Sequence, residues 1–194
     1  MKTLLFILIS YVFSSIPWGY IIAKNKGVDI TKVGSGNIGG TNIYRTFGLR
    51  LGILVGILDL LKGFLSVTLA QAFFRSDFVV GLSIISSISG HIFPVFLKFK
   101  GGKGAATTGG ILLAILPIYQ FLILLVVWIL LLKIIKIMSL TNLILVTLLP
   151  VYFFFQKKDI TIIFATFVIA ILIYYAHRKN LSRLTKGTEL KLKI

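Results

Sequence analysis

The sequence contains no cysteine and very few acidic residues. Without Cys, the 194-residue chain has no disulfides, no thiolate catalysis and no Cys-ligated zinc or iron–sulfur site. Only five Asp and Glu and two His are present, and no paired carboxylate set, HExxH, HxxxxD or GxSxG sequence occurs. The usual machinery of hydrolases and of thioester-using acyltransferases is therefore missing.

Apolar residues, in contrast, are abundant and occur in long runs. They make up 57% of the chain, against about 45 to 50% in soluble domains, and the mean hydropathy is +1.01. A run of about 20 residues is what a helix needs to cross a bilayer. The sequence therefore predicts an all-α polytopic membrane protein that forms a single domain over residues 1–194. The apolar runs are Met1–Ala23, Leu51–Phe74, Phe78–Phe99, Ile111–Ile137, Leu140–Phe155 and Ile160–Ala176.

The basic residues predict the topology. Three polar stretches, 24–50, 98–110 and 177–194, are rich in Lys and Arg, so the positive-inside rule places all three in the cytoplasm. This requires an extra crossing after residue 110. Pro117 can divide the long run into a short helix over 105–116 and a full helix to 137, which gives about seven helices with the N terminus outside and the C terminus cytoplasmic. A re-entrant segment over 140–155 is the alternative, because 16 residues barely span.

The first apolar run has two interpretations. Lys2 followed by an apolar core and then Ser14 and Ser15 resembles a signal peptide. The apolar character, however, continues past Ser15 to Ala23 and includes Trp18 and Tyr20, the aromatic residues typical of a membrane interface. We therefore expect a retained membrane span.

The net charge of +16 indicates a negatively charged partner. Because the basic residues lie between apolar runs, anionic lipid or a phosphorylated substrate is favoured over nucleic acid. No cluster of metal-ligating residues occurs in the sequence, and we expect no cofactor and a monomer.

The first polar stretch contains GSGNIGGTNIYRTFG, from Gly34 to Gly48. Glycines alone would fit a tight turn before a packed helix. Hydroxyl, carboxamide and guanidinium groups between them favour an anion site, because glycines allow close backbone approach and Arg45 presents a planar fork to phosphate oxygens. The candidate ligands here are Ser35, Gly36, Asn37, Thr41, Asn42 and Arg45.

The second stretch reads GHIFPVFLKFKGGKGAATTGG, from Gly90 to Gly110. Its Lys103 precedes a new helix, and a helix N terminus beside a lysine binds phosphate. The stretch is not a Walker loop, since Gly104 follows Lys103 where Ser or Thr is required. A flexible basic loop that touches lipid headgroups is the alternative.

The third stretch, HRKNLSRLTKGTELK, begins at His177. Asn180 follows one helical turn later, so both side chains can contact one substrate. His177 can act as a base or as a hydrogen-bond donor, or can be an interfacial residue without a function. Glu189 is expected to pair with a neighbouring basic residue, and Asp59 and Lys62, three residues apart within a span, with each other.

These three stretches, in this order, resemble the bacterial acyl phosphate:glycerol-3-phosphate acyltransferases, an integral membrane family. The resemblance covers nearly the whole chain. It rests on GSGNIGGTN with Arg45, GHIFPVFLKFKGGKG, and HRKNLSRLTKGTELK. Gly40 and Ala105 replace a usual alanine and valine, and Lys98 replaces a common glycine.

The resemblance implies a seven-helix bacterial inner-membrane enzyme with its active site at the cytoplasmic face. It implies transfer of a fatty acyl chain from long-chain acyl phosphate to the 1-hydroxyl of glycerol 3-phosphate, the first acylation step of phospholipid synthesis. Ser35 and Arg45 would hold phosphate, and Gly101, Gly102, Lys103 and Gly104 would cradle the phosphate of glycerol 3-phosphate. His177 and Asn180 would position its hydroxyls, and Ser139 is a further candidate.

Two other classes of protein, a transporter and a lipid-binding scaffold, are the alternatives to an enzyme. A transporter for an organic phosphate would carry charge within its spans, where only Asp59 and Lys62 are found, and a lipid-binding scaffold gives no reason for three phosphate-type loops on one side. The enzyme is therefore the favoured interpretation.

Overall fold

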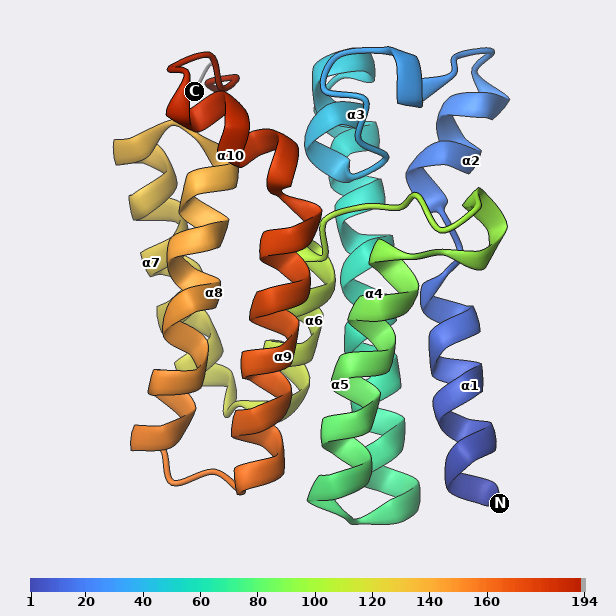
Figure 1. Cartoon of the computed structure of the whole chain (residues 1–194), viewed down its shortest axis with the longest axis vertical. Coiled ribbons are helices and arrows are strands. Elements are labelled where there is room, and N and C mark those ends of the chain that lie inside the picture. The colour runs from blue at the N-terminus through green and yellow to red at the C-terminus, as the bar shows by residue number, and fades with distance from the viewer. Residues whose placement is uncertain (193–194) are drawn as a thin grey trace.

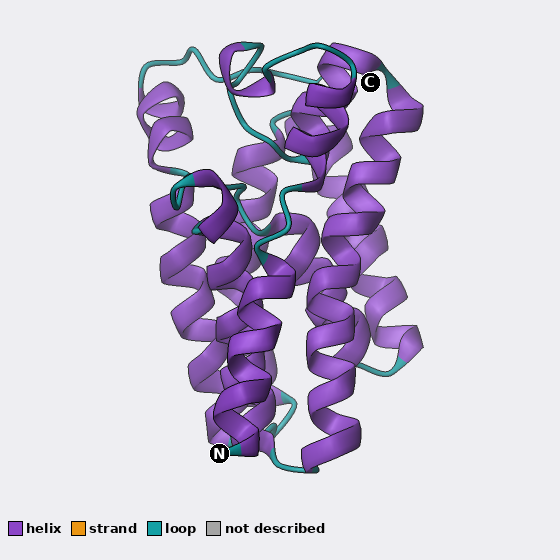
Figure 2. Ribbon diagram, turned by 90° about the vertical axis from the view of Figure 1, so that its right-hand side faces the viewer, coloured by secondary structure: helices purple, strands orange, loops and turns teal. Residues whose placement is uncertain are grey.

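The computed structural model describes residues 1–192, so residues 193–194 of the predicted domain lie outside the described part. Within residues 1–192 the chain is helical and forms no strand (Figures 1 and 2). In chain order the elements are α1 (Lys2–Ser14), α2 (Trp18–Asn25), η1 (Ile30–Lys32), α3 (Gly40–Phe47), α4 (Leu49–Phe74), α5 (Asp77–Ile92), η2 (Val95–Leu97), α6 (Ala105–Ile115), α7 (Ile118–Ile135), α8 (Met138–Phe155), α9 (Ile160–Ala176) and α10 (Arg178–Thr185).

Five segments are long and apolar enough to cross a membrane, and α9 joins them when it is taken together with α10, to which it is bent by 62°. The helix α6 is apolar but has only 11 residues. With α6 included, the described chain has seven candidate membrane helices, some of them short, which confirms the predicted all-α fold class.

Prolines set the breaks between helices. Pro17 lacks an amide hydrogen and restricts Ile16, so the predicted first span is divided into α1 and α2. The predicted division at Pro117 is confirmed, because α6 ends at Ile115 and Pro117 caps α7. The re-entrant alternative for residues 140–155 is not observed, since α8 is continuous over 18 residues.

The bundle is built around α4 and α5, with α7 at one side (Figure 1). Gly110 of α6 lies so close to α4 that a Cβ there would overlap the Leu60 carbonyl oxygen. On the other side, the Ser86 hydroxyl of α5 donates to the Ile7 carbonyl of α1 at 2.8 Å. The helix α1 is thus integrated into the bundle, as expected of a retained span.

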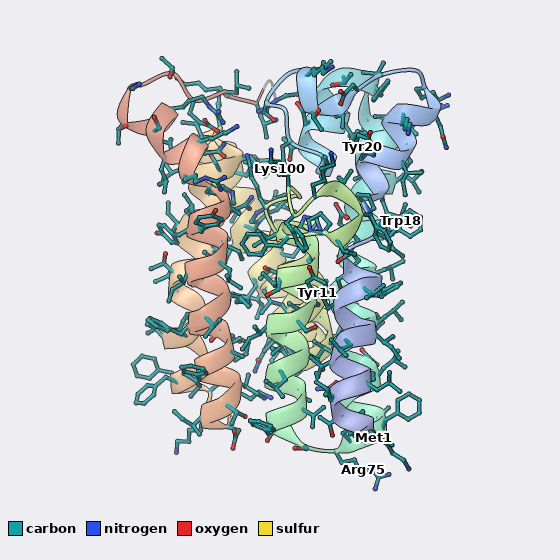
Figure 3. All side chains as sticks on the ribbon, turned by 45° about the vertical axis from the view of Figure 1, so that its right-hand side comes forward. Met1, Tyr11, Trp18, Tyr20, Arg75 and Lys100 are labelled. Carbon is teal, nitrogen blue, oxygen red and sulfur yellow. The ribbon has the colours of Figure 1, made fainter. Side chains whose placement is uncertain are left out.

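The three polar stretches gather at one end of the bundle. Figure 1 shows α3, α10 and the last described residues at the end opposite to the N terminus. Figure 3 places Met1 and Arg75 together at the N-terminal end, and Lys100 and Tyr20 toward the other. We call the end that carries α3 and α10 the polar end. Which side of a membrane it faces stays a prediction.

Candidate active site

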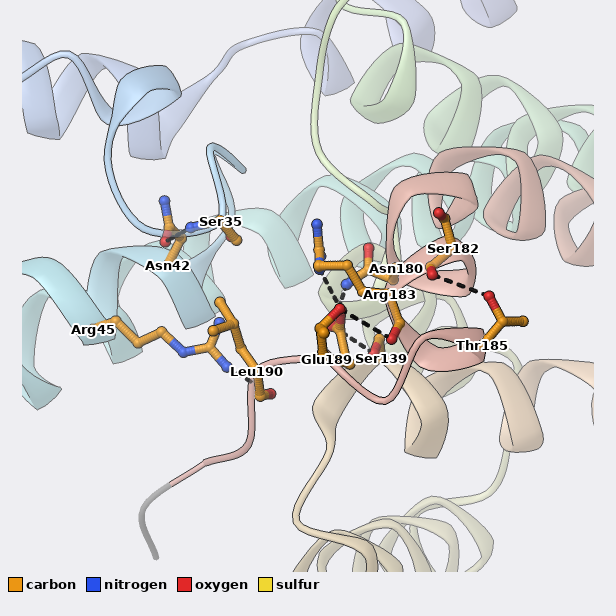
Figure 4. Close-up of polar contacts among 11 residues, drawn as sticks. Ser35, Asn42, Arg45, Ser139, Asn180, Ser182, Arg183, Thr185, Glu189 and Leu190 are labelled. Atoms are coloured by element: carbon orange, nitrogen blue, oxygen red, sulfur yellow. Dashed lines mark hydrogen bonds and ion pairs between the residues drawn. The ribbon is translucent and has the colours of Figure 1, made fainter.

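Asn42 organises the first polar stretch. Its side chain is 1% exposed, its Oδ1 accepts a hydrogen bond from the Ser35 amide at 2.9 Å, and its Nδ2 donates to the carbonyls of Val33 at 2.9 Å and Ile30 at 3.4 Å (Figure 4). These bonds occupy the carboxamide. The observed contacts of Asn42 are therefore those of a residue that shapes the loop, and its predicted direct contact with substrate stays a prediction.

Three other candidate side chains in this stretch have no protein partner. In the described chain, the side chains of Ser35, Asn37 and Thr41 make no hydrogen bond to protein. Gly36 has φ +68°, a conformation that glycine adopts without strain. The loop thus leaves two hydroxyls and one carboxamide free to bind a ligand.

Arg45 points from α3 toward the C-terminal segment. Its Nη2 donates to the Leu190 carbonyl at 3.3 Å (Figure 4). Partial burial lowers the pKa of Arg45, the charge of Glu189 opposes that effect, and the charge of Arg183 adds to it. A guanidinium nevertheless stays charged in proteins, so Arg45 brings a permanent positive charge to the polar end.

Gly101, Gly102 and Gly104 of the second stretch are glycine for two different reasons. A Cβ at Gly101 would overlap the His91 carbonyl oxygen and Pro94, and a Cβ at Gly102 would overlap the His91 ring. Gly104 has φ +81° instead. Two of these positions are therefore set by close packing on the end of α5, and one is set by backbone conformation.

Only some of the amides in the predicted phosphate cradle are free. The amides of Gly101 and Gly102 already donate to the carbonyls of Ile92 and His91, each at 3.0 Å, because the end of α5 leaves these acceptors free. They are not available to phosphate. The next amides along the chain, from Lys103 to Thr107 at the start of α6, have no partner in the described chain. The amides free for an anion therefore lie at residues 103–107 rather than at Gly101 and Gly102, and phosphate binding by this loop stays a prediction.

Lys103 lies within reach of charges from the other two stretches. Burial lowers the pKa of Lys103 to about 8, Glu189 raises it, and Arg183 and Arg45 lower it further. Groups from α3, the α6 loop and the C-terminal segment therefore share one electrostatic site. Geometry also brings the stretches near one another: Arg45 contacts Leu190, and a Cβ at Gly104 would lie 3.4 Å from the Ile173 side chain, one turn before His177. That the three stretches form one substrate site stays a prediction.

His177 and Asn180 lie at the corner between α9 and α10. The chain bends by 62° there, so these residues do not share one straight helix. His177 is 1% exposed, and its Nδ1 lies 2.8 Å from the Ile173 carbonyl oxygen, which can only accept, so Nδ1 carries the proton. Its Nε2 is the free nitrogen. Asn180 is 3% exposed, and its Oδ1 is buried without a partner in the described chain.

Glu189 organises the third stretch, a role that was not predicted. Its predicted pairing with a basic residue is confirmed at Arg183, whose Nε lies 2.6 Å from the carboxylate. The same carboxylate also accepts from the Ser139 hydroxyl at 2.8 Å and from the Asn180 amide (Figure 4). Burial raises the pKa of Glu189, but these three donors outweigh it and hold the pKa below its usual value. The only signal in the sequence is that Glu189 is the sole glutamate.

Ser139 therefore reaches the site through Glu189, and its predicted contact with substrate stays a prediction. In the described part of the chain, no three His, Cys, Asp or Glu side chains gather to hold a metal ion. The arrangement offers cations, free amides and hydroxyl acceptors, which suits anionic substrates and an anionic leaving group.

Comparisons with known proteins agree with this chemistry. Residues 4–187 match the family model for glycerol-3-phosphate acyltransferase. Two similar relatives carry that name: a protein of Wolbachia pipientis subsp. Culex pipiens is 42% identical over 98% of this chain and 99% of its own length, and one of Aquifex aeolicus is 39% identical over 97% and 98%.

Two solved structures are also similar. Both are of PlsY, an integral membrane glycerol 3-phosphate acyltransferase, and each is 36% identical to this chain. The glycerol 3-phosphate form has a TM-score of 0.94 and the lysophosphatidic acid form 0.91. Each alignment covers 100% of this chain and 96% of the other.

Proposed function

Because the chain belongs to the glycerol-3-phosphate acyltransferase family, we propose that it transfers a fatty acyl group from acyl phosphate to the 1-hydroxyl of sn-glycerol 3-phosphate. The products are lysophosphatidic acid and inorganic phosphate. Family membership supports the acyltransferase activity and the acceptor, and the chemistry of the site supports acyl phosphate as the donor.

The proposal is supported by Arg45, which reaches the C-terminal segment at Leu190, and by Lys103, which precedes the free amides that start α6 and whose pKa responds to the charges of Arg45 and Glu189. An acyl phosphate and glycerol 3-phosphate together bring two phosphoryl groups. Cations and amides in a partly desolvated site stabilise such charge far better than water does. Arg45 with Ser35 is assigned to one phosphoryl group, and Lys103 with the α6 amides to the other.

The reaction needs no strong base. The acceptor hydroxyl oxygen attacks the acyl carbonyl carbon, the bond between that carbon and the phosphate oxygen breaks, and inorganic phosphate leaves. A mixed anhydride is already activated, so the phosphate can take the hydroxyl proton as it departs. The protein then acts by positioning and by neutralising charge.

His177 and Asn180 are assigned to the hydroxyls of glycerol 3-phosphate. The Nδ1 of His177 is held by Ile173, so its Nε2 can accept a hydroxyl hydrogen, and the unpartnered Oδ1 of Asn180 offers a second acceptor. If His177 were the general base, His177→Ala would remove an ionisation from the pH profile. A lower rate with an unchanged pH profile supports positioning instead.

The location of the site follows from charge. The polar end carries the basic stretches, so the positive-inside rule assigns it to the cytoplasmic face of a bacterial inner membrane. The protein is proposed to act as a monomer, because one chain contains every group assigned above.

The test is an assay of the purified protein in detergent. We expect phosphate release from palmitoyl phosphate above the spontaneous rate only when glycerol 3-phosphate is present, together with formation of lysophosphatidic acid. Palmitoyl coenzyme A in place of palmitoyl phosphate is the matched control and should yield no product. Equal use of both donors would contradict the proposed donor, and no transfer from either would contradict the proposed activity.

A further inference from the structure

Three ionisable side chains are buried together inside the bundle, beneath the loop that carries Lys103. Asp59 and Lys62 lie on α4 and His91 lies on α5, and they are 3%, 1% and 4% exposed. Lys62 Nζ is 2.8 Å from Asp59 Oδ1 and 3.4 Å from His91 Nδ1. We call these residues the buried cluster. None of them is among the groups assigned to substrate.

Stability does not explain the buried cluster. Each ion buried in a helical membrane bundle carries a desolvation penalty of several kcal/mol, and apolar residues of similar volume often serve stability as well or better. A feature that costs stability within a membrane span points to another task. The surroundings of His91 indicate which task this is.

His91 packs against residues 101–102 of the loop that carries Lys103; we call residues 98–104 the phosphate loop. Its carbonyl accepts from the Gly102 amide at 3.0 Å, and a Cβ at Gly102 would overlap the Nε2, Cε1 and Cδ2 atoms of its ring. Unlike Gly104, Gly102 has no positive φ. The three atoms nearest to a Cβ at position 102 thus all belong to the His91 ring.

The buried cluster also lies next to the start of α6. A Cβ at Gly63, which follows Lys62, would overlap the Thr107 carbonyl oxygen in the first turn of α6. The buried cluster is therefore next to the loop on both sides of Lys103. His91 packs against the residues before Lys103, and α4 packs against the first turn of α6 after it.

We propose that Asp59, Lys62 and His91 are positioning residues for the phosphate loop. Asp59 holds Lys62, Lys62 holds the His91 ring through Nδ1, and the ring fixes the loop at Gly102, which sets the position of Lys103 and of the free α6 amides. The cluster acts on the affinity for the substrate phosphate and does not touch substrate. This inference deepens the proposed function and rests on it.

The first test replaces the ion pair without leaving an unpaired charge. Asp59→Leu with Lys62→Met keeps the volume and removes both ions, so the double variant should fold with equal or higher thermal stability. Because the His91 ring loses its partner, KM for glycerol 3-phosphate should rise about tenfold, within the range of coupling between contacting groups. KM for palmitoyl phosphate should stay within about twofold.

The second test is a double-mutant cycle between His91 and Gly102. Gly102→Ala alone should raise KM for glycerol 3-phosphate about tenfold or more, because the new methyl group displaces the loop. In a His91→Ala background the methyl group has space, so adding Gly102→Ala should change KM by less than about twofold. Gly101→Ala is the matched control: its methyl group would meet backbone and Pro94, so His91→Ala should not rescue it.

Gly81→Ala controls for general crowding of α5. A Cβ there would approach the Thr161 carbonyl oxygen at 3.0 Å, far along α5 from the loop. It should lower the melting temperature without changing KM. Additive effects in the His91–Gly102 cycle, or an unchanged KM in the stably folded ion-pair variant, would overturn the inference.

Calorimetric binding of glycerol 3-phosphate, which requires no turnover, separates the inference from the proposed function. If the wild-type protein binds glycerol 3-phosphate but transfers no acyl group, the proposed reaction is wrong. The positioning role is then decided by whether the same variants weaken binding by the same factors. A wild-type protein that binds no glycerol 3-phosphate overturns both.

Discussion

Two carboxylates organise two polar clusters in this protein, and they do so in different ways. Asp59 is held by Lys62, three positions along the same helix, and Lys62 in turn contacts His91 of the adjacent helix. Glu189 is held by Ser139, Asn180 and Arg183, which come from α8 and α10. The first cluster is local and sealed within the bundle. The second is assembled by the return of the chain after α10, at the polar end, where the Arg183 side chain is 29% exposed.

The two clusters differ in how they can influence the site: one supports a loop from below, and the other lies beside the candidate substrate-binding cations. The buried cluster lies below the loop that carries Lys103 and does not contact substrate. The charge of Glu189, in contrast, raises the pKa values of Arg45 and Lys103. A sealed cluster should respond to substitution mainly through folding and loop position. An open cluster should respond mainly through the electrostatics of the site.

The largest expected effect is from Asp59→Leu alone. It leaves the Lys62 ammonium buried without its partner, and breaking such a pair costs about 3–5 kcal/mol in the free energy of unfolding. Unfolding in detergent measures this loss. Glu189→Leu should cost less, because water can reach Arg183. Equal losses in the two variants would remove the distinction between a sealed and an open cluster.

Lys103→Ala should have the next largest effect, this time on catalysis. Deletion of a donor from a preorganised site lowers kcat by about 10²–10³, or roughly 3–4 kcal/mol. Steady-state kinetics with palmitoyl phosphate and glycerol 3-phosphate measure it. Lys100→Ala is the control, since Lys100 lies in the same loop but is exposed. A matching loss in the control would mean that general positive charge, and not the position of Lys103, matters.

The pH dependence should reveal the Glu189 cluster. Burial lowers the pKa of Lys103 to about 8, so its positive charge is present below pH 8 and is lost as the pH rises. The second ionisation of a phosphate monoester lies near pH 6, so the substrate charge is constant there. We therefore expect kcat/KM for glycerol 3-phosphate to fall above about pH 8.

Glu189→Gln should move this break to lower pH, because the negative charge of Glu189 raises the pKa of Lys103. The profile should be corrected for spontaneous hydrolysis of acyl phosphate. A break that stays in place in Glu189→Gln would show that Glu189 acts only by holding Ser139 and Asn180.

The smallest expected effect is from Lys98→Gly at the edge of the loop. Lys98 has φ 52°, a left-handed conformation that costs a residue with a Cβ about 1–2 kcal/mol. Glycine should remove most of this cost, although its greater freedom in the unfolded chain offsets part of the gain. The free energy of unfolding should therefore rise by about 0.5–1 kcal/mol. Lys100→Gly, at a residue without positive φ, should give no gain. A less stable Lys98→Gly would show that the lysine side chain, and not the backbone, matters there.

The sequence predicted those features that depend on residues close to one another in the chain. Apolar runs predicted the helices, Pro117 the division of α6 from α7, and the spacing of Asp59 and Lys62 their ion pair, because each depends on residues close in the chain. The engagement of Gly101 and Gly102 with the end of α5 could not be predicted, since it requires the loop to fold back on His91 and Ile92. The same holds for Glu189, whose partners lie up to 50 residues away.

A helix α6 of 11 residues is about 16 Å long, roughly half the hydrocarbon thickness of a bilayer. In Figure 1 it begins well below α3 and α10, at mid-height of the bundle. Lys103 precedes this start by two residues, so the backbone that carries it lies deeper in the bundle than α3 and α10 do. For the proposed reaction, glycerol 3-phosphate would therefore have to enter the bundle from the polar end, while the acyl chain could stay among the membrane helices.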